Sequence, residues 1–365
     1  MLKAAITTLS LLVSASLASA GSLNYFVTNL VSDQTGMAQI TDPNLVNAWG
    51  ISASSTSPFW VSDNGTGVST LYKVDGGVVT KLGLTVAIPG DGSVTGQFFN
   101  LGAAGGAFNG DSFLFSSEDG TISGWRGALG GTAETLMAGS PANVYKGLTY
   151  GATGGYSYGY AANFRAGTID VLKGNSGAPD LAGSFMDPTL PAGYAPFNVQ
   201  NVDGTLYVTY ALQDSTKHDE VDGPGDGFVS TFDLNGNFLG RLASNGPLDA
   251  PWGMALAPST WGTFAGDLLV GNFGDGSIDV FNPANGMFLG SLTDSSGNPL
   301  SIDGLWGLEF GNGKNGDVNT LYFSAGPGGE SHGLFGAIAP VPEPTSWLLI
   351  SGGIGLLCLL RRRVA

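Results

Sequence analysis

The densest group of carboxylates in this sequence lies in the segment QDSTKHDEVDGPGDG, residues 213–227. Five acidic residues and a histidine stand close together in it: Asp214, His218, Asp219, Glu220, Asp222 and Asp226. Carboxylates this close repel one another unless water, hydrogen bonds or a cation neutralises them, and hard oxygen ligands suit Ca²⁺. The candidate cofactor is therefore Ca²⁺, with four candidate metal ligands: Asp219, Glu220, Asp222 and Asp226. A solvated acidic loop is the alternative interpretation.

The sequence has only two histidines, His218 and His332, and they are the candidates for general acid–base chemistry. A catalytic histidine commonly works with a carboxylate that orients it, and Asp219, Glu220 or Glu330 is close enough in the sequence to serve. Hydrogen bonding to loop carbonyl groups is the competing interpretation for His332. No arranged catalytic set is visible, so the two histidines are weak catalytic candidates.

Charge and cysteine content exclude several classes of function. The chain has 13 basic and 29 acidic residues, and its formal net charge is −16. So few basic side chains cannot neutralise a row of phosphates, which excludes nucleic acid as a partner. The one cysteine, Cys358, lies near the C-terminus, so the rest of the chain can form neither disulfides nor thiolate zinc sites. An acidic surface of this kind attracts cations instead.

Residues 21–340 contain six copies of a strand–turn–strand pattern, which predicts a repeat fold. Each copy has an apolar strand, a polar turn with Gly and a second strand; the copies are 59–74, 112–125, 158–172, 206–232, 268–281 and 321–338. Flanking segments add two more strands to each copy, so a unit of roughly 50 residues holds four strands. Six such units predict an all-β, six-bladed β-propeller of four-stranded blades. Asn24–Val31 has no copy of its own, and we expect it to close the ring by completing the sixth blade.

The propeller interpretation places the candidate binding residues on one rim. In a four-stranded blade, the loop between the second and third strands lies at the same end as the start of the first strand. Polar groups and aromatic rings from these positions would surround the channel mouth, a common type of ligand site. The predicted ligand-binding rim consists of Asp63, Asp119, Asn163, His218, Trp252, Asn272, Trp306 and His332. The opposite end has mostly tight hairpins, from which we expect little binding. The alternative is that the rim Asp and Asn side chains only stabilise their own turns.

Both ends of the chain carry targeting segments. Residues 1–20 have an early lysine, an apolar run and the small residues Ala18-Ser19-Ala20, which predict a secretory signal peptide. Residues 341–365 contain an uncharged stretch, 347–360, followed by Arg361, Arg362 and Arg363. This stretch is short for a membrane span of about 20 residues, and the arginines favour the cytoplasmic side. We expect a short C-terminal transmembrane sorting helix; a plain single-span anchor is the alternative.

The C-terminal segment resembles the PEP-CTERM sorting signal of Gram-negative bacteria. The resemblance rests on Pro342, Glu343 and Pro344, the short apolar stretch and the basic terminus. It implies that an exosortase and the export machinery act on this chain, and that the tail alone contacts the membrane. It also implies transient anchoring in the inner membrane and delivery to the cell envelope, cell surface or extracellular matrix.

The body of the chain resembles NHL-type propellers. It is more closely similar to an uncharacterised family of secreted bacterial propellers, through the stretches VTNLVSDQ, TDPNLVNAWGIS, EDGTISGW and AGPGGESHGLFG. This resemblance implies the fold and export, and it implies no particular activity.

Three functions agree with these features. The favoured interpretation is a non-enzymatic surface or matrix propeller that binds a glycan, a peptide or a surface protein on one rim. The main alternative is a calcium-assisted hydrolase, lactonase or lyase at the channel mouth, which needs a metal with an open coordination position. The third is a structural envelope component without a specific ligand.

Overall fold

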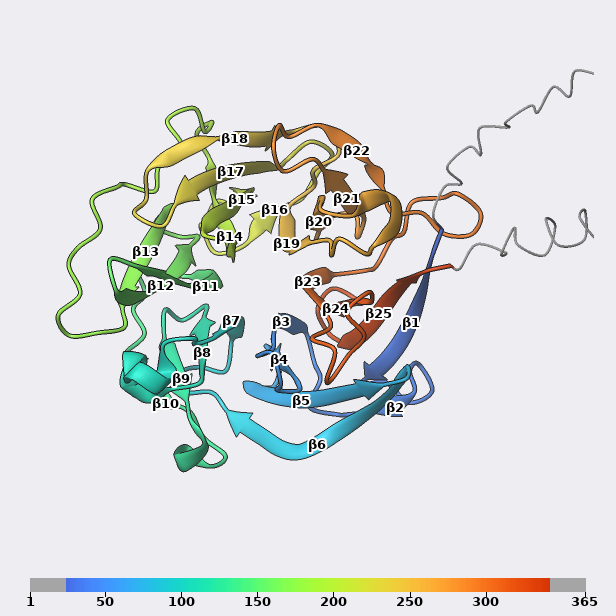
Figure 1. The fold of residues 1–365 in the computed structure, drawn as a ribbon, viewed down its shortest axis with the longest axis horizontal. Coiled ribbons are helices and arrows are strands. Elements are labelled where there is room, and N and C mark those ends of the chain that lie inside the picture. The colour runs from blue at the N-terminus through green and yellow to red at the C-terminus, as the bar shows by residue number, and fades with distance from the viewer. Residues whose placement is uncertain (1–23, 342–365) are drawn as a thin grey trace, which may run out of the picture. The chain divides into compact units, whose positions relative to one another are not determined.

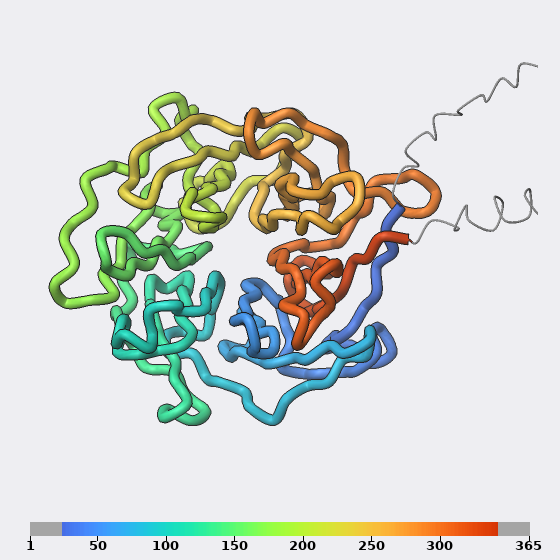
Figure 2. Tube along the Cα trace, in the orientation of Figure 1, coloured from blue at the N-terminus to red at the C-terminus, as the bar shows by residue number. Residues whose placement is uncertain are grey.

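The computed structural model describes residues 24–341, which form six antiparallel sheets around a common axis (Figure 1). The chain forms the sheets in order, so each sheet is one blade of a propeller, and the Cα trace passes once around the ring (Figure 2). The predicted six-bladed, all-β propeller is confirmed. The predicted signal peptide and the sorting residues 342–344 and 361–363 lie outside the described residues. Within the described body no helix has the length and hydrophobicity of a membrane span.

The first three blades are built from strands that follow one another along the chain. Blade one has β3 (Ala48–Ser52), β4 (Phe59–Asp63), β5 (Val68–Asp75) and β6 (Val78–Ala87). Blade two has β7 (Val94–Phe99), β8 (Phe113–Ser117), β9 (Ile122–Trp125) and β10 (Glu134–Met137). Blade three has β11 (Tyr145–Thr153), β12 (Tyr156–Asn163) and β13 (Thr168–Lys173). Three short 3-10 turns lie within blade two: η1 (Ala103–Gly105), η2 (Ala107–Gly110) and η3 (Gly127–Leu129).

The second half of the ring continues this order, and its last blade uses the start of the chain. Blade four has β14 (Tyr194–Val202), β15 (Thr205–Gln213), β16 (Glu220–Val221), β17 (Phe228–Asp233) and β18 (Phe238–Ser244). Blade five has β19 (Pro251–Leu256), η4 (Gly262–Phe264), β20 (Leu268–Asn272), β21 (Ile278–Phe281) and β22 (Phe288–Ser291). Blade six has β23 (Leu305–Phe310), β24 (Leu321–Ala325), β25 (Leu334–Pro340), β1 (Tyr25–Ser32) and β2 (Ile40–Thr41).

Burial explains why the second strand of most blades has an almost continuous apolar sequence. All five residues are buried in each of β4, β8, β20 and β24, because every blade packs between two neighbours. Outer strands such as β6 mix buried and exposed residues along their length, since part of each strand faces water. The apolar contacts between neighbouring blades form the core of the molecule.

Glycines on the inner strands allow neighbouring blades to approach closely at the axis. A Cβ atom on Gly50 would lie 2.6 Å from the carbonyl oxygen of Thr95 in the next blade. One on Gly307 would lie 2.8 Å from the carbonyl oxygen of Trp49. Both distances are shorter than a non-bonded contact allows, so these positions favour glycine. The crowding accounts for the repeated Trp-Gly pairs at 49–50, 252–253 and 306–307.

Strand β1 closes the ring. It pairs antiparallel with β25, from Tyr25 opposite Pro340 to Ser32 opposite Leu334. The side chains of Tyr25, Leu30 and Val31 are 0–2% exposed, so the strand supplies apolar packing as well as backbone hydrogen bonds. This confirms the predicted closing strand, which the structure extends by one residue at its C-terminal end.

Blade three has no fourth strand among the described residues. The segment 174–193, which connects β13 to β14, is irregular and is held by side chains instead. Phe185 packs in the core cluster that contains Tyr160. The carboxylate of Asp187 accepts hydrogen bonds from Ser230 Oγ at 2.6 Å and Arg241 Nε at 2.5 Å, both in blade four. The irregular segment thereby ties blade three to blade four.

Candidate functional site

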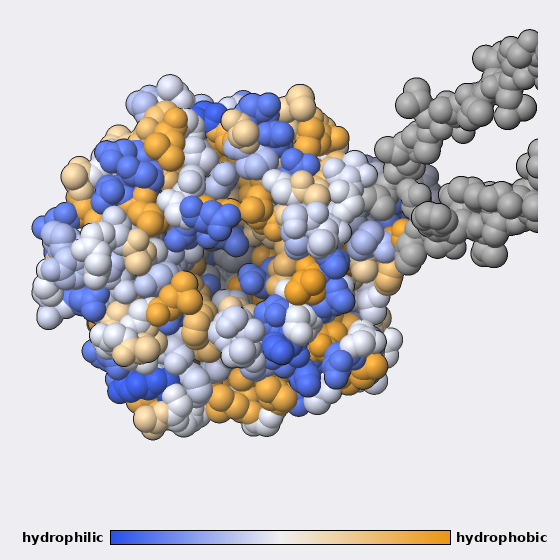
Figure 3. Space-filling view, in the orientation of Figure 1, coloured by the Kyte–Doolittle hydropathy of each residue, from blue (hydrophilic) through white to orange (hydrophobic). Residues whose placement is uncertain are grey.

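The starts of the inner strands and the loops between second and third strands meet at one end of the channel, which we call the upper mouth. Strand register fixes this arrangement: Ala48 lies opposite Asp63, Tyr145 opposite Asn163 and Pro251 opposite Asn272. The space-filling view shows that one face of the body has a hollow at its centre, bordered by hydrophilic and hydrophobic residues (Figure 3). The predicted geometry of the rim therefore follows from the strand order.

Aromatic side chains fill the channel beneath the upper mouth. The rings of Trp49 and Trp306 stack with 3.8 Å between centroids, and Trp252 meets Trp306 edge-on at 5.8 Å. We call this cluster the aromatic floor; its other members are Phe164, Phe197 and Phe273. Trp252 and Trp306, which we expected on the binding rim, are 4% and 0% exposed. They support the mouth from below and present almost no surface to a ligand.

A buried lysine lies on this floor. The Nζ atom of Lys146, on β11, is 2.5 Å from Glu118 Oε1 and 3.2 Å from Asp219 Oδ1. It also lies 5.1 Å from the centroid of the Trp49 ring, close enough for a cation–π contact. Burial alone would lower the pKa of the Lys146 ammonium, but Glu118, Glu220 and Asp219 raise it above its ordinary value. The lysine is therefore a permanent positive charge inside the mouth.

Two further carboxylates lie beside this lysine. Glu220 Oε2 is buried without a hydrogen-bond partner among the described residues, and burial raises the pKa of Glu220 to about 7. Burial also raises the pKa of Glu330, whose Oε2 accepts a hydrogen bond from Asn47 Nδ2 at 2.6 Å. Asn64 Nδ2 donates to Glu118 Oε2 at 3.1 Å and joins blade one to the network. We call the five charged residues the lysine cluster: Glu118, Lys146, Asp219, Glu220 and Glu330. Four acids share one ammonium, so the cluster is negative when they are ionised.

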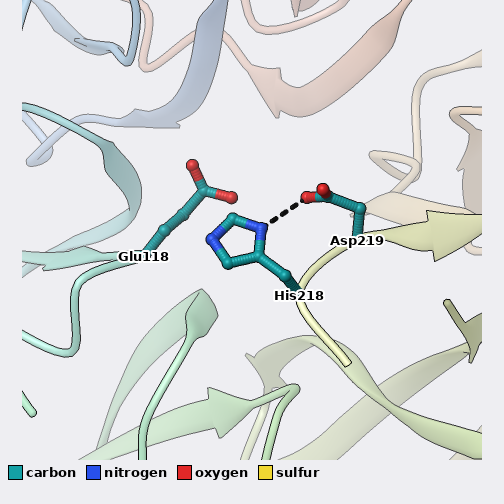
Figure 4. Close-up of side chains that lie close together, drawn as sticks. All are labelled: Glu118, His218 and Asp219. Carbon is teal, nitrogen blue, oxygen red and sulfur yellow. Dashed lines mark hydrogen bonds and ion pairs between the residues drawn. The ribbon is translucent and has the colours of Figure 1, made fainter. Parts of the chain in front are cut away.

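His218 stands at the edge of the lysine cluster. Its Nδ1 is 2.8 Å from Asp219 Oδ1, and its ring also lies close to Glu118 (Figure 4). One ligand atom from each of Glu118, His218 and Asp219 lies within 4.8 Å of the others, which is close enough to hold a metal ion. Imidazole and carboxylates together suit Zn²⁺ or Mn²⁺, whereas Ca²⁺ prefers oxygen ligands throughout.

The predicted calcium ligands are divided between two places. Asp219 and Glu220 belong to the lysine cluster. Asp222 and Asp226 lie near Asp249, whose pKa is raised by burial and by the surrounding acids. The Asp249 carboxylate accepts a hydrogen bond from the Gly223 backbone N–H at 2.7 Å. The possible metal ligands around Asp219 are thus Glu118 and His218. Asp222 and Asp226, although close to Asp219 in the sequence, lie near Asp249 instead.

Three predicted rim residues are buried in their own turns. Asp63, Asn163 and Asn272 are 0%, 1% and 0% exposed. Asn272 Nδ2 donates to Asp279 Oδ2 at 2.8 Å, and Asn163 Nδ2 donates to Asp170 Oδ2 at 2.9 Å. Burial raises the pKa of Asp63 well above its ordinary range. These contacts agree with the turn-stabilising interpretation for the two asparagines, whereas both carboxylate oxygens of Asp63 are buried without a hydrogen-bond partner among the described residues.

A polar groove of about 290 Å³ connects the lysine cluster to the outer rim of blades two and three. We call it the rim groove; it is lined by Asp91, Ser93, Glu118, Asp119, Ser140, Pro141, Asn143, Arg165 and His218. The structure thus brings together two residues of the predicted rim, Asp119 and His218. His332 has a different partner, because its Nδ1 is 2.9 Å from Asp33 Oδ2.

A serine in blade three also has spacing that occurs in hydrolases. Residues 155–159, GYSYG, match the Gly-x-Ser-x-Gly pattern of nucleophile elbows, a match that the sequence analysis overlooked. An elbow needs a sharp turn from a strand to a helix, whereas Ser157 lies inside β12. Its Oγ is 3.0 Å from the hydroxyl of Tyr150, and the side chain is buried. We therefore do not assign a catalytic role to this serine.

The sequence places Lys146, the central residue of the cluster, among the residues expected to face this mouth, but it assigns the lysine no binding or catalytic role. The repeat register does contain a signal for it, because Tyr145 and Ala48 occupy equivalent positions opposite the ends of β12 and β4. Lys146 therefore stands where blade one has Trp49. Blades one, five and six have tryptophan at this position, so a lysine there indicates that blade three places a charge where the others place an aromatic ring.

Comparison with known proteins agrees with the fold and with export. Residues 340–364 match the PEP-CTERM protein-sorting motif, which indicates an exported, envelope-associated protein recognised by an exosortase. The alpha-L-arabinanase of Penicillium chrysogenum has a similar fold, with a TM-score of 0.51 and 11% identity over 80% of this chain and 93% of that chain. An identity this low shows the fold alone.

Two relatives extend along nearly the whole chain. They are the uncharacterised proteins L690 and R648 of Acanthamoeba polyphaga mimivirus, each 32% identical to this chain. The match to L690 covers 86% of this chain and 85% of that protein, and the match to R648 covers 85% and 78%. This exported six-bladed propeller therefore belongs to the same protein family as L690 and R648.

Proposed function

We propose that the protein is a non-enzymatic binding module of the cell surface or matrix, and that it holds its ligand in the rim groove next to the lysine cluster. The observation that carries the proposal is the groove itself, because it is the place where predicted rim residues share an open, polar surface. Arg165 is the one arginine or lysine in the groove lining, against three acids, and its Nη1 donates a hydrogen bond to the Pro141 carbonyl at 2.8 Å. The proposal includes delivery as predicted, with residues 1–20 as signal peptide, 21–340 as the exported body and transient inner-membrane anchoring through 341–365.

Charge favours a ligand that carries positive groups. Asp91, Glu118 and Asp119 line the groove, and the remaining acids of the lysine cluster lie behind Glu118. Lys146 is 1% exposed and engaged by two carboxylates, so it offers little to a bound anion. Electrostatic complementarity therefore supports a basic segment of a peptide or surface protein over an acidic glycan.

A labelled hexalysine peptide tests this assignment with the full chain. Replacing Asp91 and Asp119 with asparagine should weaken peptide binding about tenfold, which corresponds to about 1.4 kcal/mol. The matched control replaces Asp75 and Asp203 with asparagine; both are exposed and lie in hairpins at the opposite end of their blades. Fluorescence anisotropy at low salt measures both. Equal losses in the two variants would mean that only the overall negative charge attracts the peptide, and the groove would be rejected as the site.

A second candidate function is a metal-assisted hydrolase, lactonase or lyase, and the Glu118–His218–Asp219 triad supports it. On this alternative, Ca²⁺ or Zn²⁺ should raise the thermal unfolding midpoint, because an ion that binds only the folded state stabilises it by mass action. His218→Ala should abolish that shift, and His332→Ala should leave it unchanged, since His332 contacts Asp33 instead. If neither Ca²⁺ nor Zn²⁺ raises the unfolding midpoint, the metal-assisted alternative is rejected, because the only positive charge in the lysine cluster is then the Lys146 ammonium.

A further inference from the structure

The opposite end of the channel, which we call the lower mouth, holds a cavity of about 350 Å³. Residues from all six inner strands line this lower cavity. Strand register places five of them at one level of the channel: Ser52, Phe98, Thr149, Gln200 and Glu309. We expected little binding at this end because its turns are tight. The cavity is formed by the inner strands themselves, and the hairpins do not close it.

Glu309 is the only charged residue that lines the lower cavity. It is half-buried, and it has no hydrogen bond or ion pair among the described residues. Burial raises the pKa of Glu309 to about 8. A carboxyl group that lies so far from a counter-ion costs stability when it ionises, so its presence in the channel calls for a functional reason.

Two buried polar atoms beside the lower cavity have no hydrogen-bond partner among the described residues. Gln97 Nε2 already donates to the carbonyl oxygens of Gly50 at 2.7 Å and Trp60 at 2.8 Å, while its buried Oε1 accepts nothing among the described residues. The buried Oγ of Ser52 also has no partner. Because both atoms are buried, the acceptors that an occupant can reach are the carboxylate of Glu309 and the side-chain amide oxygen of Gln200, which is half-buried and has no side-chain hydrogen bond among the described residues.

We propose that the lower cavity binds a small organic ammonium ion, a primary amine, with Glu309 as its counter-ion. A single carboxylate cannot supply the several oxygen ligands that Ca²⁺ or Mg²⁺ needs, so a metal ion fits less well. Phe99, Leu101 and Tyr150 line the cavity with side chains that are at least partly exposed, which suits the hydrocarbon part of an amine and permits cation–π contacts with the two rings. This site lies at the other end of the channel from the proposed groove and is independent of that proposal.

Binding of the ammonium ion is coupled to proton release. Below about pH 8 the empty site is mainly protonated, so the carboxyl must lose its proton to pair with the cation. Affinity therefore rises by up to about tenfold per pH unit and levels off near pH 8. Tyr150 is the only other titratable side chain that lines the cavity, and its hydroxyl is hydrogen-bonded to Ser157. No other group of the six inner strands that faces Glu309 there changes charge over this range.

Isothermal titration of the full chain with n-butylammonium chloride tests the proposal. We expect saturable binding at pH 8, weaker binding at pH 6, and a proton release that appears when buffers of different ionisation enthalpy are compared. Glu309→Gln has nearly the same shape as the wild type and should lower the affinity at least about tenfold at pH 8. Asp203→Asn removes an exposed carboxylate at the same end of the molecule that does not line the cavity, and it should leave the affinity unchanged, which separates this site from general negative charge.

A neutral probe completes the test. n-Butanol has the same hydrocarbon chain without the charge, and it should bind weakly and independently of pH. Equal affinity for n-butanol and n-butylammonium, or equal binding by Glu309→Gln and wild type, would overturn the proposal. Failure to bind n-butylammonium at pH 8 would also overturn it, and none of these results would affect the assignment of the rim groove.

Discussion

Replacing Lys146 with methionine will lower the free energy of unfolding by about 3–5 kcal/mol at neutral pH. The lysine is 1% exposed and pairs with Glu118, whose side chain is 12% exposed, so its loss leaves Glu118 and the buried Glu220 without a counter-ion; Asp219, at 62% exposed, loses less. Chemical denaturation monitored by tryptophan fluorescence measures the change. Lys173→Met is the matched control; that lysine pairs with Asp180 on the surface, and its removal should have almost no effect.

The cost of Lys146→Met will depend on pH in a defined direction. Burial opposes ionisation of Asp219, but Lys146 and His218 hold its pKa below the ordinary value. The stability gained from this carboxylate is present above about pH 4, where the unfolded-state group is ionised, and is lost as the pH falls through the folded-state pKa. The difference between variant and wild type should therefore shrink in acid. A difference that stayed constant would show that lost packing, and not the charge, causes the destabilisation.

Deleting β1 (Tyr25–Ser32) will abolish cooperative unfolding of the body. The deletion exposes the edge of β25 and removes the buried side chains of Tyr25, Leu30 and Val31. Each such side chain contributes about 1.5–3 kcal/mol when fully buried. Their sum is comparable with the whole stability of a typical domain, about 5–15 kcal/mol. Calorimetry should show a broad or absent transition, and the truncated body should aggregate through its free edge.

Two further measurements test whether the loss of cooperativity comes from the missing strand itself. A synthetic peptide of residues 24–32 added to the truncated body should restore a cooperative transition, because it can pair with β25 again. Val27→Thr in the intact chain alters a side chain of β1 that is 39% exposed, and it should be nearly neutral. An intact transition in the truncated body without the peptide would show that the ring does not need this strand.

The number of blades and their closure were predictable because both leave repeated local signals. A Gly just before the third strand recurs in the blades, and in four of them, at Gly67, Gly120, Gly167 and Gly276, it has a positive φ. Strand β1 was predictable for the opposite reason, since its segment has no repeat. The missing fourth strand of blade three was not visible, because the packing of Phe185 and the contacts of Asp187 depend on blade four.

The sequence predicted which end of the propeller carries the candidate site, but it did not predict which side chains form it. Asp/Asn-Gly turns have the same sequence whether or not their side chains also reach an open surface. Asp63, Asn163 and Asn272 therefore could not be distinguished from Asp119, which accepts a hydrogen bond from the Thr121 backbone in its own turn and also lines the groove. The lysine cluster joins residues that lie 28 and 73 positions apart, Lys146 with Glu118 and Asp219, and only the closed ring brings them together. Glu309 was overlooked because its inner strand resembles the others in sequence.

The pairing of β1 with β25 also sets the time at which the body can finish folding. The first strand of the body, β1, cannot pair until the last strand, β25, has been synthesised. At the end of this strand pair, the backbone N–H of Val341 donates a hydrogen bond to the Asn24 carbonyl at 2.7 Å. Contacts between residues about 300 positions apart close slowly, because the intervening chain must be ordered first. Nearly the whole body is therefore synthesised before the ring can lock. The last strand of the body therefore controls the final step of its folding.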